Sequence, residues 1–292
     1  MQIWSGQTYN EIRQGIKSLK FSPRCASCKE NFENQNYLSI LARAYDANIP
    51  LQEYPSIMEL ELSNDCNLEC IMCQGALSSS IRKNRDKLLP LENPYDGHFV
   101  SQLSEFIPHL KELRFNGGEP FLSKTCWDIW DIVLDINPGI KMVIATNGSV
   151  LNEKVKALLE KGSFHINLSL DSLRKENYEA IRKNASFEKT MENFEFFYQY
   201  CLNKKTTLCV LTNPMKQNWQ EIPDFINFCN SRNLPIWFNT IIHPVECALW
   251  ALSAEKLQEV FAALSQINFT IPESSFYQSK HNIEVFNNLV FK

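Results

Sequence analysis

Three cysteines lie close together in the segment NDCNLECIMCQG, as Cys66, Cys70 and Cys73. Cysteine thiolates hold zinc ions and iron–sulfur clusters, and both kinds of site usually take four protein ligands. Gaps of three and two residues allow one loop to direct three thiolates at a compact inorganic core. Three thiolates on a cubane leave one iron open to a ligand from outside the protein. The spacing therefore favours an iron–sulfur cluster; the alternatives are a zinc site completed from elsewhere, or coincidence.

The other seven cysteines fall into two groups. Cys25 and Cys28 form a second close pair. The remaining five stand in apolar or helical patterns, where a free thiol behaves as a small core residue; they are Cys126, Cys201, Cys209, Cys229 and Cys247. The polar N-terminus and the lack of an apolar run of about 18 residues predict a cytoplasmic protein with no membrane partner. Because a reducing cytosol disfavours disulfides, the pair Cys25 and Cys28 and the loop cysteines Cys66, Cys70 and Cys73 predict metal or redox use.

Charge and motif content narrow the function classes. The formal net charge of -4 gives no reason to expect a nucleic-acid partner. The densest basic stretch, residues 82–87, is interpreted as a solvated helix face. The sequence lacks the motifs of serine hydrolases, P-loop proteins and dinucleotide-binding folds. Among the five histidines, His243 is the one predicted to face a substrate, because it follows the last predicted strand.

Short apolar stretches alternate with longer amphipathic ones from residue 55 onward. The predicted strands cover residues 57–62, 112–115, 140–146, 165–170, 207–212 and 236–241. The predicted helices cover residues 98–109, 124–136, 151–161, 174–203, 219–231 and 253–266. This alternation predicts an α/β fold with parallel strands and right-handed crossovers. An open doubly wound sheet and an incomplete barrel both fit it. Residues 1–54 are predicted to form a mostly helical extension, and residues 268–292 a C-terminal tail.

The unusual residues follow the predicted strands. In parallel α/β folds, chemistry is located at the carboxyl ends of the strands. The first predicted strand leads into the three cysteines. The next four lead into Gly117-Gly118-Glu119-Pro120, Thr146-Asn147-Gly148, Ser169-Leu170-Asp171 and Asn213-Pro214. Each of these segments alone is an ordinary turn or cap signal, but their shared position predicts that they meet at one rim.

Taken in order, these motifs resemble those of the radical S-adenosylmethionine (SAM) superfamily over roughly residues 55–267. The resemblance implies a partial (β/α)6 TIM-like barrel. It implies that Cys66, Cys70 and Cys73 each bind one iron of a 4Fe–4S cluster and that SAM binds the fourth iron. It also implies an enzyme that cleaves SAM reductively to a 5′-deoxyadenosyl radical, which abstracts hydrogen from a substrate.

The same resemblance suggests roles for further residues. Gly117, Gly118 and Glu119 would line the methionine end of SAM and accept from its amino group, and Met72 would pack near the adenine. Candidates for the ribose or carboxylate side are Asn147, Ser169, Asp171 and Asn213. The implied partners are a flavodoxin- or ferredoxin-type reductant and a peptide, protein or small-molecule substrate.

The N-terminal segment resembles the closing half of an auxiliary cluster region of the twitch or SPASM type. The resemblance rests on residues 3–6, residues 11–13 and the pair Cys25 and Cys28, and it favours a peptide or protein substrate. Residues 1–24 contain no cysteine, so the opening half is missing. The favoured interpretation is a truncated chain whose second iron–sulfur cluster is completed upstream. The alternatives are a degenerate region, with a small zinc site or none, and completion by Cys247 and another remote cysteine.

Two rival functions accompany the enzyme interpretation. One is a zinc- or cluster-binding structural or regulatory protein on a degenerate barrel. The other is a chain that cleaves SAM without turning over a substrate.

Overall fold

The computed structural model describes residues 4–37, 40 and 53–291. The chain forms two compact units. The N-terminal unit consists of Met1–Met58 with His109–Lys111, and the barrel unit of Glu59–Pro108 with Glu112–Lys292. Among the helices of the described residues, none is both long enough and apolar enough to cross a membrane.

The N-terminal unit is helical, as the sequence predicts. It contains α1 (Gln7–Lys17), the 3-10 turn η1 (Pro23–Cys25) and α2 (Ala26–Glu33). Neither α1 nor α2 has a buried residue. Local contacts order the N-terminal unit instead. One is a cation–π contact, in which the Arg13 guanidinium lies 4.2 Å from the centre of the Trp4 ring.

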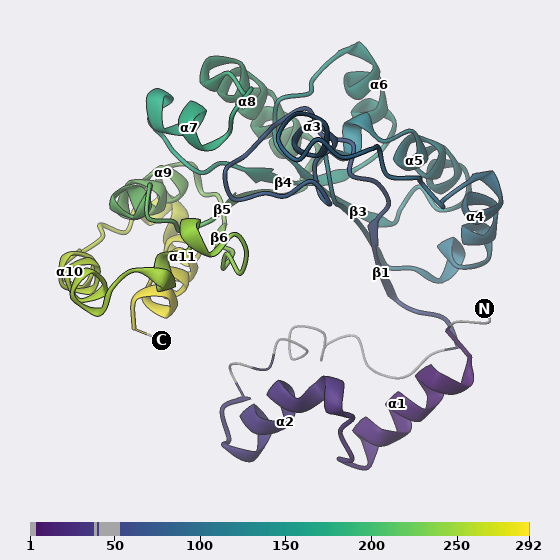
Figure 1. The fold of residues 1–292 in the computed structure, drawn as a ribbon. Helices are drawn as coiled ribbons and strands as arrows, with labels where there is room; N and C mark the ends of the chain where they lie inside the picture. The colour runs from purple at the N-terminus through teal and green to yellow at the C-terminus, as the bar shows by residue number, and fades with distance from the viewer. Residues whose placement is uncertain (1–3, 38–39, 41–52, 292) are drawn as a thin grey trace. The chain divides into compact units, whose positions relative to one another are not determined.

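The described residues form a sheet of six strands in the order β1-β2-β3-β4-β5-β6. Figure 1 labels β3, β4, β5 and β6 in succession along this sheet. The strands are β1 (Ile57–Glu61), β2 (Glu112–Asn116), β3 (Lys141–Thr146), β4 (Phe164–Ser169), β5 (Leu208–Thr212) and β6 (Ile236–Phe238). From β2 to β6 each pair is parallel. A doubly wound sheet reverses its order at a switch point, whereas this order never reverses. The partial TIM-like barrel is therefore confirmed, and the doubly wound alternative does not apply.

Helices follow the strands as the alternation predicts. They are α3 (Ser79–Asn84), α4 (Gly97–Gln102), α5 (Lys124–Ile136), α6 (Glu153–Lys161), α7 (Lys175–Ile181), α8 (Phe187–Lys204), α9 (Ile222–Arg232), α10 (Ala254–Ser265) and α11 (Phe276–Phe291). The 3-10 turns that follow β1 along the chain are η4 (Leu103–Glu105), η5 (Ile107–His109), η6 (Pro120–Leu122), η7 (Trp219–Glu221), η8 (Val245–Cys247), η9 (Leu249–Ala251) and η10 (Glu273–Ser275). The helix predicted over 174–203 is split into α7 and α8, because Asn184 between them has a φ of 72°.

Alternate residues of each strand face opposite sides of the sheet. The outward set is apolar and buried, as with Phe115, Ile144 and Phe164. These side chains pack against α5, where the Trp130 ring centre lies 5.4 Å from Phe115 and 6.3 Å from Phe164. The inward set is largely polar, and it lines the inside of the open barrel.

The C-terminal segment, which the sequence interpretation leaves as a tail, contains helix α11. Asn282 on this helix is fully buried. Its side-chain amide donates to Asn230 Oδ1 and to Leu234 O, both at 2.9 Å, and its oxygen accepts from the Ile236 amide at 3.2 Å. One side chain therefore ties α11 to the start of β6.

Replacing Asn282 with alanine should leave three buried polar groups unpaired. We expect Asn282→Ala to lower the free energy of unfolding by about 3 kcal/mol, measured by urea denaturation. Asn287→Ala, on the exposed side of the same helix, is the matched control and should change it little. Equal stability of the two variants would contradict this assignment.

Candidate active site

The cysteine loop, residues 64–75, connects β1 to α3 and is fastened at its base. The Ser79 amide donates to Asn64 O at 2.6 Å, and Ser79 Oγ accepts from the Cys66 amide at 3.1 Å. Ser78 Oγ donates to Leu68 O at 2.7 Å and also caps α3 by accepting from the Ile81 amide. The serines at the helix start thus hold the loop through hydrogen bonds to its backbone.

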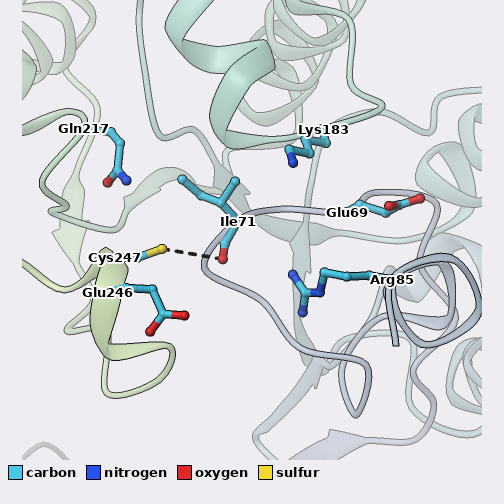
Figure 2. Close-up of a pocket in the computed structure, with 7 residues that line it drawn as sticks. All are labelled: Glu69, Ile71, Arg85, Lys183, Gln217, Glu246 and Cys247. Atoms are coloured by element: carbon cyan, nitrogen blue, oxygen red, sulfur yellow. Dashed lines mark hydrogen bonds between the residues drawn. The ribbon is translucent and has the colours of Figure 1, made fainter. Parts of the chain in front are cut away.

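The tip of the cysteine loop is fastened to the segment between α7 and α8. The Glu69 amide donates to Lys183 O at 3.0 Å, and the Ile71 amide donates to Ile181 O at 2.9 Å. These two bonds flank Cys70, which is buried. Figure 2 shows a pocket beside this tip, where the Cys247 thiol donates to Ile71 O at 3.5 Å.

The three thiols of the loop are close enough to act on one another. Burial is the largest influence and raises the pKa of Cys66, Cys70 and Cys73, that of Cys70 to about 12. Arg182 opposes this rise at Cys70, whereas the neighbouring Cys66 and Cys73 add to it. None of the three forms a disulfide. In the described part of the chain, no three Cys, His, Asp or Glu side chains are gathered tightly enough for a single metal ion.

Gly117 and Gly118 let the end of β2 touch the start of the cysteine loop. Their φ angles are 78° and 38°, which side-chain-bearing residues rarely adopt. A Cβ on Gly118 would lie 2.4 Å from Asp65 O, and the Glu119 amide donates to that same oxygen at 2.6 Å. The glycine pair is therefore required by the packing of the loop, one residue before Cys66.

Glu119 links the ends of β2 and β3. Its buried carboxylate accepts from Thr146 Oγ1 at 2.9 and 3.0 Å, from the Asn147 amide at 2.7 Å and from the Phe121 amide at 3.3 Å. Burial raises the pKa of Glu119 to about 7, against the hydrogen bonds from Asn147 and Thr146. Protein donors thus already occupy the carboxylate that the sequence analysis assigns to a ligand amine, and the ligand role stays a prediction.

Asn147 is brought against the cysteine loop, as a shared rim requires. Its Nδ2 lies 3.8 Å from Cys66 Sγ and 3.2 Å from Asn67 Oδ1. Met72 packs against a small apolar cluster beyond β5 and β6 that includes Met215 and Ile241. Ser169, at the end of β4, is half-buried.

Asp171 is fully buried and engaged. Its Oδ2 lies 2.6 Å from Arg182 Nη2, and its Oδ1 accepts from the amide and the side chain of Asn213 at 2.8 and 3.0 Å. Burial alone would lower the pKa of Arg182, but Asp171 and Cys70 raise it, so the guanidinium stays charged. Arg182 is a site residue that sequence reasoning missed, because it stands inside a helical pattern without a motif.

The inward face of the strands lines a cavity of about 560 Å³. His165 of β4 is among its lining residues, whereas His243 is exposed and precedes Pro244. His165, rather than the predicted His243, is therefore the histidine placed in this cavity. Its position follows from strand alternation, which the sequence shows as His165 beside the buried Ile166.

Cys25 and Cys28 belong to the N-terminal unit. Cys25 ends η1 and Cys28 lies in α2, and both are partly exposed. The Cys25 thiol lies 3.5 Å from Ser22 Oγ.

Comparison with known proteins yields one family. The sequence model of the Radical SAM superfamily matches residues 60–229. The molybdenum cofactor biosynthesis protein moc-5 of Caenorhabditis elegans is 32% identical over 185 residues, covering 62% of this chain and 29% of that protein. The GTP 3′,8-cyclase of Helicobacter pylori strain HPAG1 is 27% identical over 179 residues, covering 61% and 53%. The chain thus spans about half the length, or less, of these curated relatives.

Two solved structures share the fold. A structure of anSMEcpe with bound AdoMet matches with a TM-score of 0.53 and 18% identity, covering 72% of this chain and 58% of that one. SuiB of Streptococcus suis matches with a TM-score of 0.51 and 15% identity, covering 82% and 60%. At such identities the likeness concerns the fold alone. The comparisons do not confirm the twitch or SPASM remnant.

The glycine contact can be tested through cluster loading. Gly118→Ala should push Asp65 and the loop away and reduce reconstituted iron and sulfide per chain to less than half of the parent value. Gly139→Ala is the matched control, because a Cβ there meets open space. Iron content in Gly118→Ala equal to that of the control would contradict the role given to the glycine pair.

Burial of Glu119 predicts that the free energy of unfolding depends on pH. Its folded pKa of about 7 lies above the ordinary 4.5, so its stabilising contribution is complete below pH 4.5 and is lost as the pH rises to 7. Relative to Glu119→Gln, which does not titrate, the parent should lose about 3 kcal/mol of unfolding free energy across that window. Urea denaturation of both proteins at several pH values measures this. Parallel stability profiles would contradict it.

Proposed function

The chain belongs to the radical SAM superfamily, whose cofactors are a 4Fe–4S cluster and SAM. On this basis we propose which of its residues bind these cofactors and the substrate. We propose that it is an enzyme that abstracts hydrogen from a small polar molecule bound inside the barrel. The observation that carries the proposal is the cysteine loop: three disulfide-free thiols on one loop, fastened at base and tip by backbone hydrogen bonds. When bound and reduced, the cluster supplies one electron to SAM, whose cleavage generates the hydrogen-abstracting radical.

Cys66, Cys70 and Cys73 would hold the cluster. Their donor set fits it, because three thiolates leave one iron for SAM. Metal binding releases the thiol protons, which the raised pKa of Cys70 otherwise retains. The charged Arg182 beside Cys70 favours the thiolate and offsets part of the negative charge that gathers there.

SAM would lie along the rim next to the loop. Gly117 and Gly118 would present their backbone to its methionine end. Glu119 is the carboxylate predicted to accept from its amino group. Met72 would contact the adenine from the apolar cluster against which it packs. The ribose or carboxylate side would be met from the ends of β3, β4 and β5, by Asn147, Ser169 and Asn213. Asp171, predicted for the same role, is fully buried and bonds Asn213 and Arg182 instead.

The relatives favour a small-molecule substrate over a peptide. They are named as GTP 3′,8-cyclases and molybdenum cofactor biosynthesis proteins. The peptide or protein substrate favoured by the sequence analysis rested on the auxiliary-cluster resemblance of Cys25 and Cys28. That resemblance lacks support from the comparisons, so the peptide substrate is not retained and the second cluster stays a prediction.

The reductant would be a flavodoxin- or ferredoxin-type carrier that approaches the outer side of the cysteine loop. A pocket of about 610 Å³ lies there, and Figure 2 shows its lining residues. Arg85 is exposed and donates to Cys73 O at 2.8 Å. Lys83 and Lys183 are exposed on neighbouring segments, whereas Glu69 and Glu246 also line the pocket, so its charges balance and the carrier class stays a prediction.

Anaerobic reconstitution tests the proposed function. The parent protein should bind iron and sulfide and form 5′-deoxyadenosine from SAM under dithionite. The combined variant Cys66→Ala/Cys70→Ala/Cys73→Ala should lose the site-specific cluster and all SAM cleavage. Cys201→Ala, which removes a buried thiol of α8, is the matched control and should retain both.

Two outcomes would contradict the proposal. One is a parent protein without iron and sulfide, and the other is SAM cleavage that survives the triple substitution. The double variant Cys25→Ala/Cys28→Ala, measured in parallel, reports whether the N-terminal pair adds iron of its own.

A further inference from the structure

The wall of the barrel cavity formed by β1, β2 and β3 carries charges of both signs. Its charged lining side chains are Glu59, Glu112, Arg114 and Lys141. They join into one network. Lys141 Nζ lies 2.9 Å from Glu112 Oε2, while Arg114 bonds Glu112 Oε1 and lies 3.8 Å from Glu59 Oε2. Asn116 donates to the remaining oxygen of Glu59.

The two acids and two bases of this network cancel. Burial would raise the pKa of Glu112, but the hydrogen bonds from Lys141 and Arg114 outweigh it and lower that pKa, so the acid stays ionised. A phosphate group brought to either cation therefore also meets a carboxylate that the cation already neutralises. Repulsion between the phosphate and this carboxylate disfavours polyanionic ligands.

The opposite wall, from β4, β5 and β6, is uncharged and has hydrogen-bonding capacity left over. Asn167 and Asn239 line the cavity, and their side-chain amides bond to no described residue. The Trp237 indole, also in the lining, is 52% exposed. An open aromatic face near two free amides suits a flat ring with donors and acceptors on its edge.

His165 adds a donor of defined orientation to this wall. Its Nδ1 accepts from the Thr207 amide at 3.2 Å, so the proton of the neutral ring resides on Nε2. Burial, and then Lys141, lower the pKa of His165, which favours this neutral form. The tautomer itself is set by the Thr207 contact.

From these two walls we infer that the cavity takes an uncharged heteroaromatic ring of the nucleobase class, as in a nucleoside, and discriminates against the corresponding triphosphate. This inference rests on the proposed function and specifies its substrate. It separates this chain from the relatives whose names specify GTP. The ring would stack on Trp237 and bond along its edge to Asn167 and Asn239, which lie within two residues of Trp237 in strand register.

Equilibrium dialysis of reconstituted holoprotein, saturated with SAM, tests the inference with guanosine and GTP as probes. Guanosine should bind at least tenfold more tightly than GTP. Binding of GTP as tight as that of guanosine would overturn the inference, and so would failure of guanosine to bind. Guanosine that binds without SAM but is displaced by saturating SAM would also overturn it, because the cavity would then belong to the adenine of SAM.

Two variants sharpen the test. Glu112→Gln leaves Lys141 without a charged partner and should raise GTP affinity about tenfold while changing guanosine affinity less than twofold. Because this is a gain of binding, misfolding cannot imitate it. Unchanged GTP affinity would count against charge cancellation as the reason for discrimination.

Trp237→Leu should weaken guanosine binding about tenfold through loss of stacking. Trp250→Leu is the matched control: Trp250 is also 52% exposed but does not line this cavity. Equal losses in both variants would overturn the assignment of Trp237. Formation of 5′-deoxyadenosine, measured separately, reports the proposed function, so its absence with intact guanosine binding would contradict that function and leave the inference supported.

Discussion

The approach of Gly118 to Asp65 is the constraint on which the site depends. The end of β2 and the start of the cysteine loop come so close that a single methyl group would lie 2.4 Å from a carbonyl oxygen. The amide of Glu119 uses this approach to bond Asp65, while its side chain reaches Thr146 and the Asn147 amide. The tripeptide Gly117-Gly118-Glu119 thereby fixes the positions of the cysteine loop, the end of β2 and the end of β3 relative to one another. As a consequence, Asn147 is held beside Cys66.

A buried ion pair, Arg182 and Asp171, lies next to the cysteine loop and affects the charge of its thiols. Arg182 and Asp171 are both nearly inaccessible to solvent and lie 2.6 Å apart. A buried pair of this kind contributes little net stability compared with apolar packing. Its position instead places a permanent cation beside Cys70, where thiolates would gather negative charge. The hydrogen bonds from the Glu69 and Ile71 amides to the carbonyls of Lys183 and Ile181 keep Arg182 next to the cysteines.

Much of this arrangement could be predicted from the sequence, because strand alternation and strand-end motifs are local signals. The strand positions, the parallel order and the shared rim follow from them. The remainder depends on contacts between distant residues. Arg182 follows the end of α7 at Ile181, an end that the helical pattern of the sequence does not show. Glu119 is predicted as a ligand, whereas the structure shows its carboxylate bonded to Thr146 and the Asn147 amide. The polar side of β2 is visible in the sequence, where Glu112, Arg114 and Asn116 alternate with Leu113 and Phe115.

The central claim is that three cysteines hold a cluster whose remaining iron is reserved for SAM. Mössbauer spectroscopy of protein reconstituted with iron-57, recorded with and without SAM, tests it most directly. The account predicts that SAM alters the signal of one iron in the cluster and leaves the three thiolate-bound irons unchanged. A spectrum that SAM does not change, or that shows four equivalent irons in its presence, would contradict it.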